Sequence, residues 1–172
     1  CSKKDLVFFE KFINETVTQN EVCLNPKKTE KILFSLINDD IHSSDTNNLP
    51  ESLQYLGFEF DGNKVFIRSS SMSRYYRKMS RKVDAAVYDA YDPEFSQRDL
   101  IFRKSLYKKF TCVGKNNFIT YGIKAQKIMN NSTSIKKQIK GSIGKLEKRI
   151  DRVRKKKEKT LRKMDMEIKH MK

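Results

Sequence analysis

The feature that most constrains the fold is a change in hydrophobic periodicity at the serine run Ser69–Ser71. Before it, residues 53–60 and 64–68 alternate between apolar and polar side chains, and Asp61-Gly62-Asn63 between them favours a tight turn. After it, apolar residues recur every three or four positions, which is the period of a helix. The sequence therefore predicts an α+β fold in which a small antiparallel β unit precedes an all-helical bundle.

The first domain is placed at residues 1–70, where the β unit is expected to carry a flanking helix. Apolar residues at helical spacing predict that helix over 3–18. Residues 22–24 and 30–34 are expected to be short extended segments. Residues 37–50 are rich in Asn, Asp and Ser, and this composition favours a loop.

The second domain, residues 71–172, is predicted to be helical throughout. Its first helix, over 72–91, has an apolar stripe that predicts a buried face. The opposite side of this helix carries five cations: Arg74, Arg77, Lys78, Arg81 and Lys82.

Further helices are expected downstream. The capping pair Ser96 and Asp99 predicts a second helix that runs to about Phe110. A third helix is expected over 118–129. Ser134 is expected to cap a long final helix, which continues past two internal glycines and ends in a lysine-rich stretch.

Positive charge is concentrated in the helical part. The chain has 37 Lys and Arg against 21 Asp and Glu, for a formal charge of +16. Residues 1–62 hold 6 basic and 11 acidic side chains, whereas residues 63–172 hold 31 and 10. An excess of this size favours a polyanion as partner, and a nucleic acid above all. The alternative is a helical surface that is solvated by lysines and binds nothing.

The few cysteines and histidines limit the kinds of metal site that the chain can form. Three cysteines lie far apart without a C-x-x-C pair, and the chain has two histidines, so we expect no zinc site. Scattered thiols fit a reducing compartment, which favours a cytoplasmic protein. The sequence has no run of about 18 apolar residues, so we expect no membrane span.

Two short motifs carry a family resemblance. Asn25-Pro26-Lys27-Lys28-Thr29 follows a short apolar segment, and Tyr55-Leu56-Gly57-Phe58 comes about 25 residues later. In this order and spacing they resemble the end of the palm domain of a bacterial reverse transcriptase. The resemblance is greatest to the enzymes of antiphage defence, including the abortive-infection kind, and retron and group II intron enzymes are more distant. It implies a distal palm over 1–70 and a thumb over 71–172.

The resemblance implies roles for particular residues. Lys28 would protonate the departing pyrophosphate, and Tyr55, Leu56, Gly57 and Phe58 would form the primer grip that holds the 3′ end of the growing strand. The structural alternatives are a solvated loop lysine and an ordinary hairpin. The thumb would contact nucleic acid through Arg68, Arg74, Tyr75, Arg77, Lys78 and Arg81. Tyr75 or Tyr76 could instead simply pack, and the apolar stripe favours packing for Tyr76.

The chain departs from the family where metal ions should bind. The catalytic aspartates are absent, and Asp39-Asp40 stands in a polar segment without flanking strands. We therefore expect Mg²⁺ to be held by residues outside this chain, in the remaining part of the polymerase, and this segment alone to be inactive. Expected partners are a DNA primer and an RNA template or noncoding RNA.

Three functional classes remain open at this point. The first is the palm and thumb of an RNA-directed DNA polymerase, and the second is a non-catalytic basic module that scaffolds an RNA. The third is a helical protein whose last helix makes a coiled coil, which the lysine run at 154–157 disfavours. The oligomeric state is left open.

Overall fold

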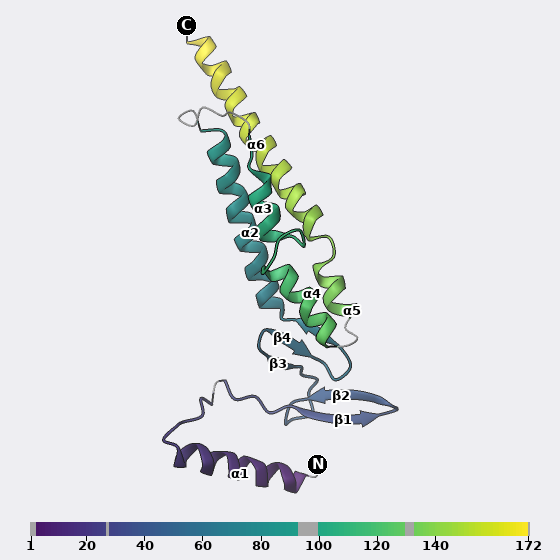
Figure 1. Cartoon of the computed structure of the whole chain (residues 1–172). Coiled ribbons are helices and arrows are strands. Elements are labelled where there is room, and N and C mark those ends of the chain that lie inside the picture. The colour runs from purple at the N-terminus through teal and green to yellow at the C-terminus, as the bar shows by residue number, and fades with distance from the viewer. Residues whose placement is uncertain (1–2, 27, 93–99, 130–132, 172) are drawn as a thin grey trace. The chain divides into compact units, whose positions relative to one another are not determined.

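The computed structural model describes residues 3–26, 28–92, 100–129 and 133–171 (Figure 1). The predicted α+β class is confirmed, since two small antiparallel sheets accompany the helices. By compactness the chain divides into an N-terminal unit, Cys1–Leu53, and a C-terminal unit, Gln54–Lys172. We expected the division at residue 70. It lies earlier because the strands beyond Leu53 pack against helices of the C-terminal unit.

The N-terminal unit begins with the predicted helix, α1, Lys3–Gln19. The strand predicted at 22–24 is wrong. The Val22 N–H instead donates to the Val17 carbonyl oxygen (3.0 Å), so the chain folds back on the end of α1. Backbone groups used to close a helix are not available for pairing with a neighbouring strand.

A hairpin follows in the same unit. Strand β1, Leu33–Ile37, pairs in antiparallel register with β2, Asp40–Ser44. The extended segment predicted at 30–34 therefore exists but lies later in the chain. The loop predicted over 37–50 is wrong at β2. Asn38 and Asp39 have φ of 52° and 65°, the two-residue geometry that joins hairpin strands.

The C-terminal unit opens with a three-stranded antiparallel meander. Strand β3, Leu53–Tyr55, lies beside β4, Phe58–Phe60, which pairs with β5, Val65–Ile67. The predicted turn is confirmed: Asp61 Oδ1 accepts hydrogen bonds from the N–H groups of Asn63 (2.9 Å) and Lys64 (2.7 Å). Phe58 and Ile67 face each other across the pair and are both buried.

Every described element after β5 is a helix, as the periodicity predicts. These helices are α2, Ser69–Ala90; α3, Arg103–Phe110; α4, Phe118–Ile128; α5, Thr133–Ile139; and α6, Ser142–His170.

Two of the predicted helix boundaries are corrected by the structure. Residues 100–102 are not helical, so α3 begins at Arg103, and the pair Ser96 and Asp99 lies outside the described residues. The long final helix is in fact two helices, because Gly141 has φ of 85° and separates α5 from α6.

The core of the C-terminal unit forms where α2 and α6 pack along each other (Figure 1). Val83 of α2 and Leu146 and Ile150 of α6 are completely buried. Beside them Arg149 grips Asp84 with two hydrogen bonds, Nε to Oδ1 at 2.9 Å and Nη2 to Oδ2 at 2.5 Å. Such a forked ion pair fixes the register of the two helices as well as joining them.

Candidate nucleic-acid interface

Helix α2 presents a continuous basic face. All five cations predicted for it, Arg74, Arg77, Lys78, Arg81 and Lys82, are exposed, while the buried residues of α2 lie on its other side. Residues three and four positions apart are neighbours on a helix, so these cations form one stripe along its axis. A helix with such a stripe can lie against the regularly spaced phosphates of a duplex.

Part of this stripe borders a groove of about 450 Å³ between α2, the end of α3 and the start of α4. We call it the α2–α3 groove. Arg74 and Lys78 line it from α2, Lys109 lines it from α3, and Asn116 lines it from the loop before α4. None of the described residues that line the groove carries a carboxylate, so its field attracts anions.

The wall of the groove is held rigidly by Asn117. Its side-chain oxygen accepts from the Thr120 N–H (3.0 Å), while the Thr120 hydroxyl accepts from the Asn117 N–H (2.9 Å), which is a reciprocal helix cap. The Asn117 amide also donates to the carbonyl oxygens of Lys108 (3.0 Å) and Thr111 (2.7 Å). One side chain thus fixes the start of α4 against the end of α3.

Tyr75 has a structural position, which corrects the role that we expected for it. Its side chain is buried and lies in the core, its ring stacks on Phe118 with centroids 4.8 Å apart, and its hydroxyl donates to the Phe110 carbonyl oxygen (2.7 Å). Burial raises the pKa of the Tyr75 hydroxyl, with a smaller contribution from neighbouring Tyr76. Since its ring and hydroxyl are both occupied, Tyr75 supports the groove wall and is no longer a candidate contact.

The turn at Tyr55–Phe58 adjoins this groove. Leu56 and Gly57 have φ of 46° and 87°, so the two form a tight turn between β3 and β4, and Gly57 takes a conformation that other residues rarely adopt. Tyr55 and Leu56 are exposed, whereas Phe58 is buried against Tyr121.

Two contacts join the turn to the start of α2. The Gly57 carbonyl oxygen accepts from the Arg68 N–H (2.9 Å), and Arg68 itself is exposed. A Cβ atom added to Gly57 would lie 3.7 Å from Ser71 Oγ, and Ser71 lines the α2–α3 groove. The exposed tip of the turn and the basic groove are therefore neighbouring parts of one surface.

Lys28 lies in the N-terminal unit, in a turn closed on a single carbonyl oxygen. The N–H groups of Lys28 (2.9 Å) and Thr29 (3.0 Å) both donate to the Asn25 oxygen, as does the Thr29 hydroxyl (2.9 Å). The Lys28 side chain is exposed. These hydrogen bonds fix the backbone of Lys28 and Thr29, and the Lys28 ammonium group is accessible.

Sequence reasoning missed Lys109 and Asn116. Neither belongs to a motif, and the sequence does not indicate which helices pack against the end of α3, where Lys109 lies. The Asn-x-x-Thr spacing at Asn117 and Thr120 could have indicated them, because it predicts that a helix starts at residue 118. A helix that starts there lies only a short loop after α3, so the residues between the two helices would be expected near each other.

Among the residues that the structure describes, no three His, Cys, Asp or Glu side chains gather closely enough to hold a metal ion. The described residues therefore do not fit a Mg²⁺ site. No described helix is long and apolar enough to cross a membrane.

No protein-family model matches this chain, and a search of curated proteins finds no match to it.

Proposed function

We propose that this chain is the distal palm and thumb of an RNA-directed DNA polymerase of bacterial antiphage defence, and that it grips the primer–template duplex. The proposal rests on the resemblance of the two sequence motifs and on one structural observation. The Tyr55–Phe58 turn adjoins a groove that is lined by Arg74, Lys78 and Lys109. The protein would act in the cytoplasm, together with the part of the polymerase that holds the catalytic metal ions.

The surface suits a strand end that must be held in place. Cations from two helices contact phosphates without reading bases, so they bind any sequence. Gly57 exposes backbone without a side chain beside this groove, which allows a sugar–phosphate chain to approach closely. Tyr55 and Leu56 supply exposed apolar area at the same turn, against which a sugar or base can pack.

Lys28 is the proposed general acid. When the bond to the leaving pyrophosphate breaks, negative charge grows on the pyrophosphate oxygen, and a nearby ammonium group can stabilise that charge and donate a proton to it. The exposed Lys28 side chain, on a backbone that is hydrogen-bonded to Asn25, is compatible with this role. The metal ions that activate the primer hydroxyl would be bound elsewhere in the polymerase.

Duplex binding tests the interface. The triple variant Arg74→Glu, Lys78→Glu, Lys109→Glu reverses the charge of the α2–α3 groove. For the wild type, affinity for a primer–template duplex should fall by about 10² to 10³-fold or more between 50 and 200 mM salt, as expected when five or six phosphates are neutralised. Because three of those contacts are lost, the variant should show a slope of log affinity against log salt that is smaller by about three.

The matched control reverses three exposed lysines outside the groove, Lys124→Glu, Lys148→Glu and Lys163→Glu. Both variants change the net charge equally, so a long-range charge effect would lower both slopes alike. Fluorescence anisotropy with a labelled duplex measures the slopes. Equal slopes for the two variants would remove the groove from the interface.

The second candidate function is a non-catalytic module that scaffolds an RNA. It is favoured by a groove whose cations suit the phosphates of any strand. The two candidates differ in chemistry. A protein that includes this segment and extends a primer in the presence of template supports the polymerase, whereas one that binds RNA without extension supports the scaffold.

A further inference from the structure

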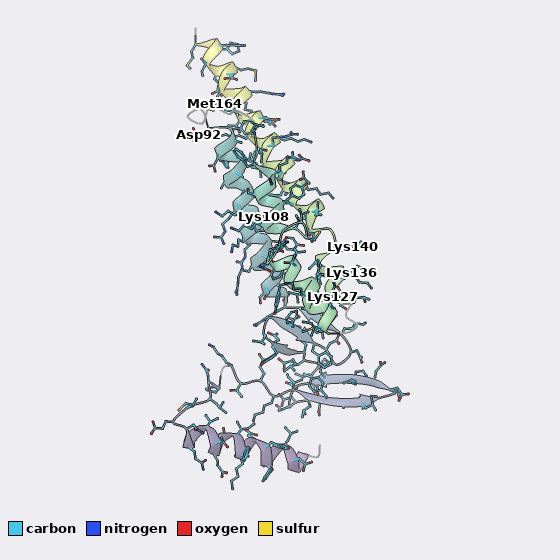
Figure 2. All side chains as sticks on the ribbon, viewed as in Figure 1. Asp92, Lys108, Lys127, Lys136, Lys140 and Met164 are labelled. Atoms are coloured by element: carbon cyan, nitrogen blue, oxygen red, sulfur yellow. The ribbon has the colours of Figure 1, made fainter. Side chains whose placement is uncertain are left out.

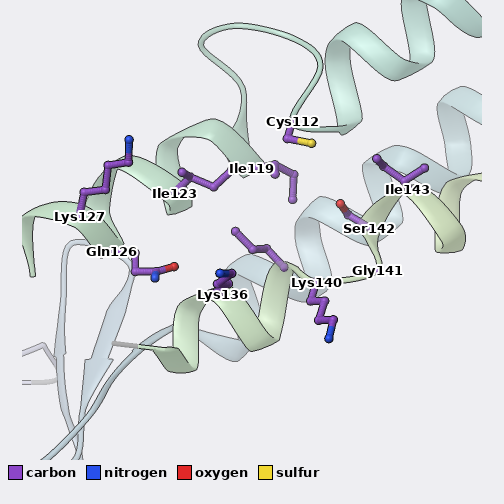
Figure 3. A pocket seen from close by; sticks show the side chains of 11 residues that line it. Cys112, Ile119, Ile123, Gln126, Lys127, Lys136, Lys140, Gly141, Ser142 and Ile143 are labelled. Carbon is purple, nitrogen blue, oxygen red and sulfur yellow. The ribbon is translucent and has the colours of Figure 1, made fainter. Parts of the chain in front are cut away.

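A second cavity, of about 430 Å³, lies between α4, α5 and the first turn of α6 (Figure 3). We call it the α4–α6 cavity. Its walls are apolar and include Ile119, Ile123 and Ile139. None of the residues in the α2–α3 groove lines it, so the two sites are separate. Its size is that of a small-molecule site.

Three lysines surround the α4–α6 cavity. Lys127 extends from α4, Lys136 extends from α5, and Lys140 follows the end of α5 (Figure 2). All three are exposed, and none of the described lining residues is acidic. An apolar floor within a purely cationic rim favours a ligand that has an uncharged body and an anionic end.

The start of α6 supplies a polar end to the cavity. Gly141 bends the chain, and the first helical hydrogen bond runs from the Lys145 N–H to its carbonyl oxygen (2.9 Å). The three N–H groups before Lys145 therefore have no partner within the helix. Free N–H groups at a helix start, together with the helix dipole, attract anions, and phosphate in particular.

Ser142 points independently to a ligand. Its side chain is only 5% exposed, and its hydroxyl has no hydrogen-bond partner among the described residues. Figure 3 shows this hydroxyl directed into the cavity, between the isoleucine wall and the lysine rim. The Ser142 oxygen is not fully buried and is open to the cavity, where a bound acceptor can pair with the hydroxyl.

We propose that the α4–α6 cavity binds a nucleoside monophosphate group, either as a free nucleotide or as the 5′ end of a strand. The phosphate accepts hydrogen bonds from the Ser142 hydroxyl and the first N–H groups of α6, and Lys136 and Lys140 neutralise it. The base and sugar pack on the isoleucine wall. This inference does not depend on the proposed polymerase function, because the cavity and the α2–α3 groove share no lining residue.

Cys112 provides a built-in reporter. It lines the α4–α6 cavity, and it is an exposed free thiol, as is Cys23 in the N-terminal unit. Iodoacetamide should alkylate both, and peptide mapping by mass spectrometry should resolve the two rates. Saturating AMP should slow the alkylation of Cys112 several-fold and leave that of Cys23 unchanged. Equal rates with and without AMP would overturn the proposal.

Calorimetric titration separates the contribution of the phosphate to the binding affinity from that of the nucleoside. AMP should bind more tightly than either adenosine, which lacks the phosphate, or inorganic phosphate, which lacks the body that packs on the wall. If adenosine or inorganic phosphate binds as tightly as AMP, the proposed ligand is wrong. A dinucleotide with a 5′ phosphate is compared with the same dinucleotide bearing a 5′ hydroxyl. Tighter binding of the phosphorylated dinucleotide assigns the site to a strand end, whereas binding of AMP alone assigns it to free nucleotides.

Variants locate the binding. The pair Lys136→Gln and Lys140→Gln should weaken AMP by about tenfold or more, since two charge-assisted contacts are lost. Ser142→Ala should weaken it by several-fold through the lost hydroxyl. Lys148→Gln, an exposed lysine of α6 outside the cavity, should bind AMP as the wild type does. Wild-type affinity in the double variant would refute the assigned site.

Discussion

Gly114 lies where the chain leaves α3, and the fold leaves no space for a side chain there. A Cβ atom at this position would come within 1.7 Å of the Lys108 carbonyl oxygen, which is backbone and cannot rotate away. The same carbonyl accepts a hydrogen bond from the Asn117 amide (3.0 Å). The wall of the α2–α3 groove therefore depends on two features: Gly114 has no side chain, and the Asn117 side chain binds the Lys108 carbonyl oxygen.

Gly114→Ala should lower the free energy of unfolding by about 2 to 3 kcal/mol, because the loop must move away from α3. Gly144→Ala is the matched control. Gly144 lies within α6 with nothing within 4 Å of an added Cβ atom, so alanine should raise the free energy of unfolding by about 0.5 to 1 kcal/mol. Urea unfolding of both variants measures these changes, and equal stabilities would show that the loop adapts freely.

Lys28 is the residue on which the proposed chemistry depends. In the complete polymerase, Lys28→Ala should slow nucleotide addition by about 10²-fold, the lower end for a general acid, because water can partly replace the lost proton donor. Duplex affinity should change little, since the lysine acts on the leaving group. Single-turnover extension of a primed template measures the rate.

Lys28→Arg separates charge from proton transfer at this position. Arginine keeps the positive charge, but it does not give up its proton at neutral pH. The rate should therefore stay low in this variant. Extension at the wild-type rate by Lys28→Ala would identify Lys28 as a surface lysine.

Gln138 joins α5 to the edge of the meander. Its side-chain oxygen accepts from the Ile67 N–H (2.7 Å), and its amide donates to the Ile67 carbonyl oxygen (2.9 Å). A single carboxamide thus pairs with β5 as a further strand would. Because an edge strand otherwise leaves such groups unpaired, this contact anchors the meander to the helices.

Gln138→Ala should lower the free energy of unfolding by about 1 to 3 kcal/mol, because two partly buried backbone groups lose their partner. Gln138→Glu keeps the acceptor but places a negative oxygen against the Ile67 carbonyl, so it should also destabilise. Lys137→Ala, at the exposed neighbouring position, controls for the helix itself. Thermal unfolding of the three variants measures the difference, and a Gln138→Ala curve that matches Lys137→Ala would contradict the anchoring role.

The elements that could be predicted from sequence are those with an uninterrupted pattern. Helices α1, α2 and α4 and the hairpin at Asp61 follow from periodicity and turn residues alone. Strand β2 was missed because its polar composition resembles a loop, although Asn38 and Asp39 favour the positive φ of a hairpin turn. The break at Gly141 was missed because apolar spacing continues across it.

Part of the candidate site could be predicted from sequence, because helix periodicity shows which side chains share a face. The cations of α2 could be assigned to an exposed face because periodicity places them opposite the core. The apolar stripe favours Tyr76 as the packed residue, but the structure buries Tyr75 and leaves Tyr76 half-buried. Their positions depend on Phe110 and Phe118, which come from other helices. Tertiary partners of this kind cannot be read from a local pattern.

The buried residues are distributed unevenly along the chain. Every buried side chain among the described residues belongs to the C-terminal unit, and the first of them is Phe58. In the N-terminal unit, large apolar side chains such as Val7, Phe8 and Leu36 are about two-thirds exposed, at 69%, 67% and 70%. The hydrophobic contribution to stability is proportional to buried apolar area, so the C-terminal unit should hold most of it.

Amide hydrogen exchange should therefore divide the chain at the boundary between the units. Amides of α1, β1 and β2 are hydrogen-bonded but lack a buried layer behind them, so they should open locally and exchange quickly. Amides of α2 and α6 around Val83 and Leu146 should exchange only on global unfolding. If the free energy of unfolding is about 5 kcal/mol or more, these amides should exchange about 10³-fold or more slowly than amides that open locally.

Mass spectrometry of peptides from the full chain measures both classes of amide in one experiment. The meander is the internal control, because its strand β5 pairs with Gln138 and should share the protection of the helices. Equal protection of β1 and α2 would contradict the division. If the N-terminal unit is part of the distal palm, adding the catalytic part of the polymerase should slow exchange in α1, because its apolar side chains would then be covered. Exchange in α2 should change little.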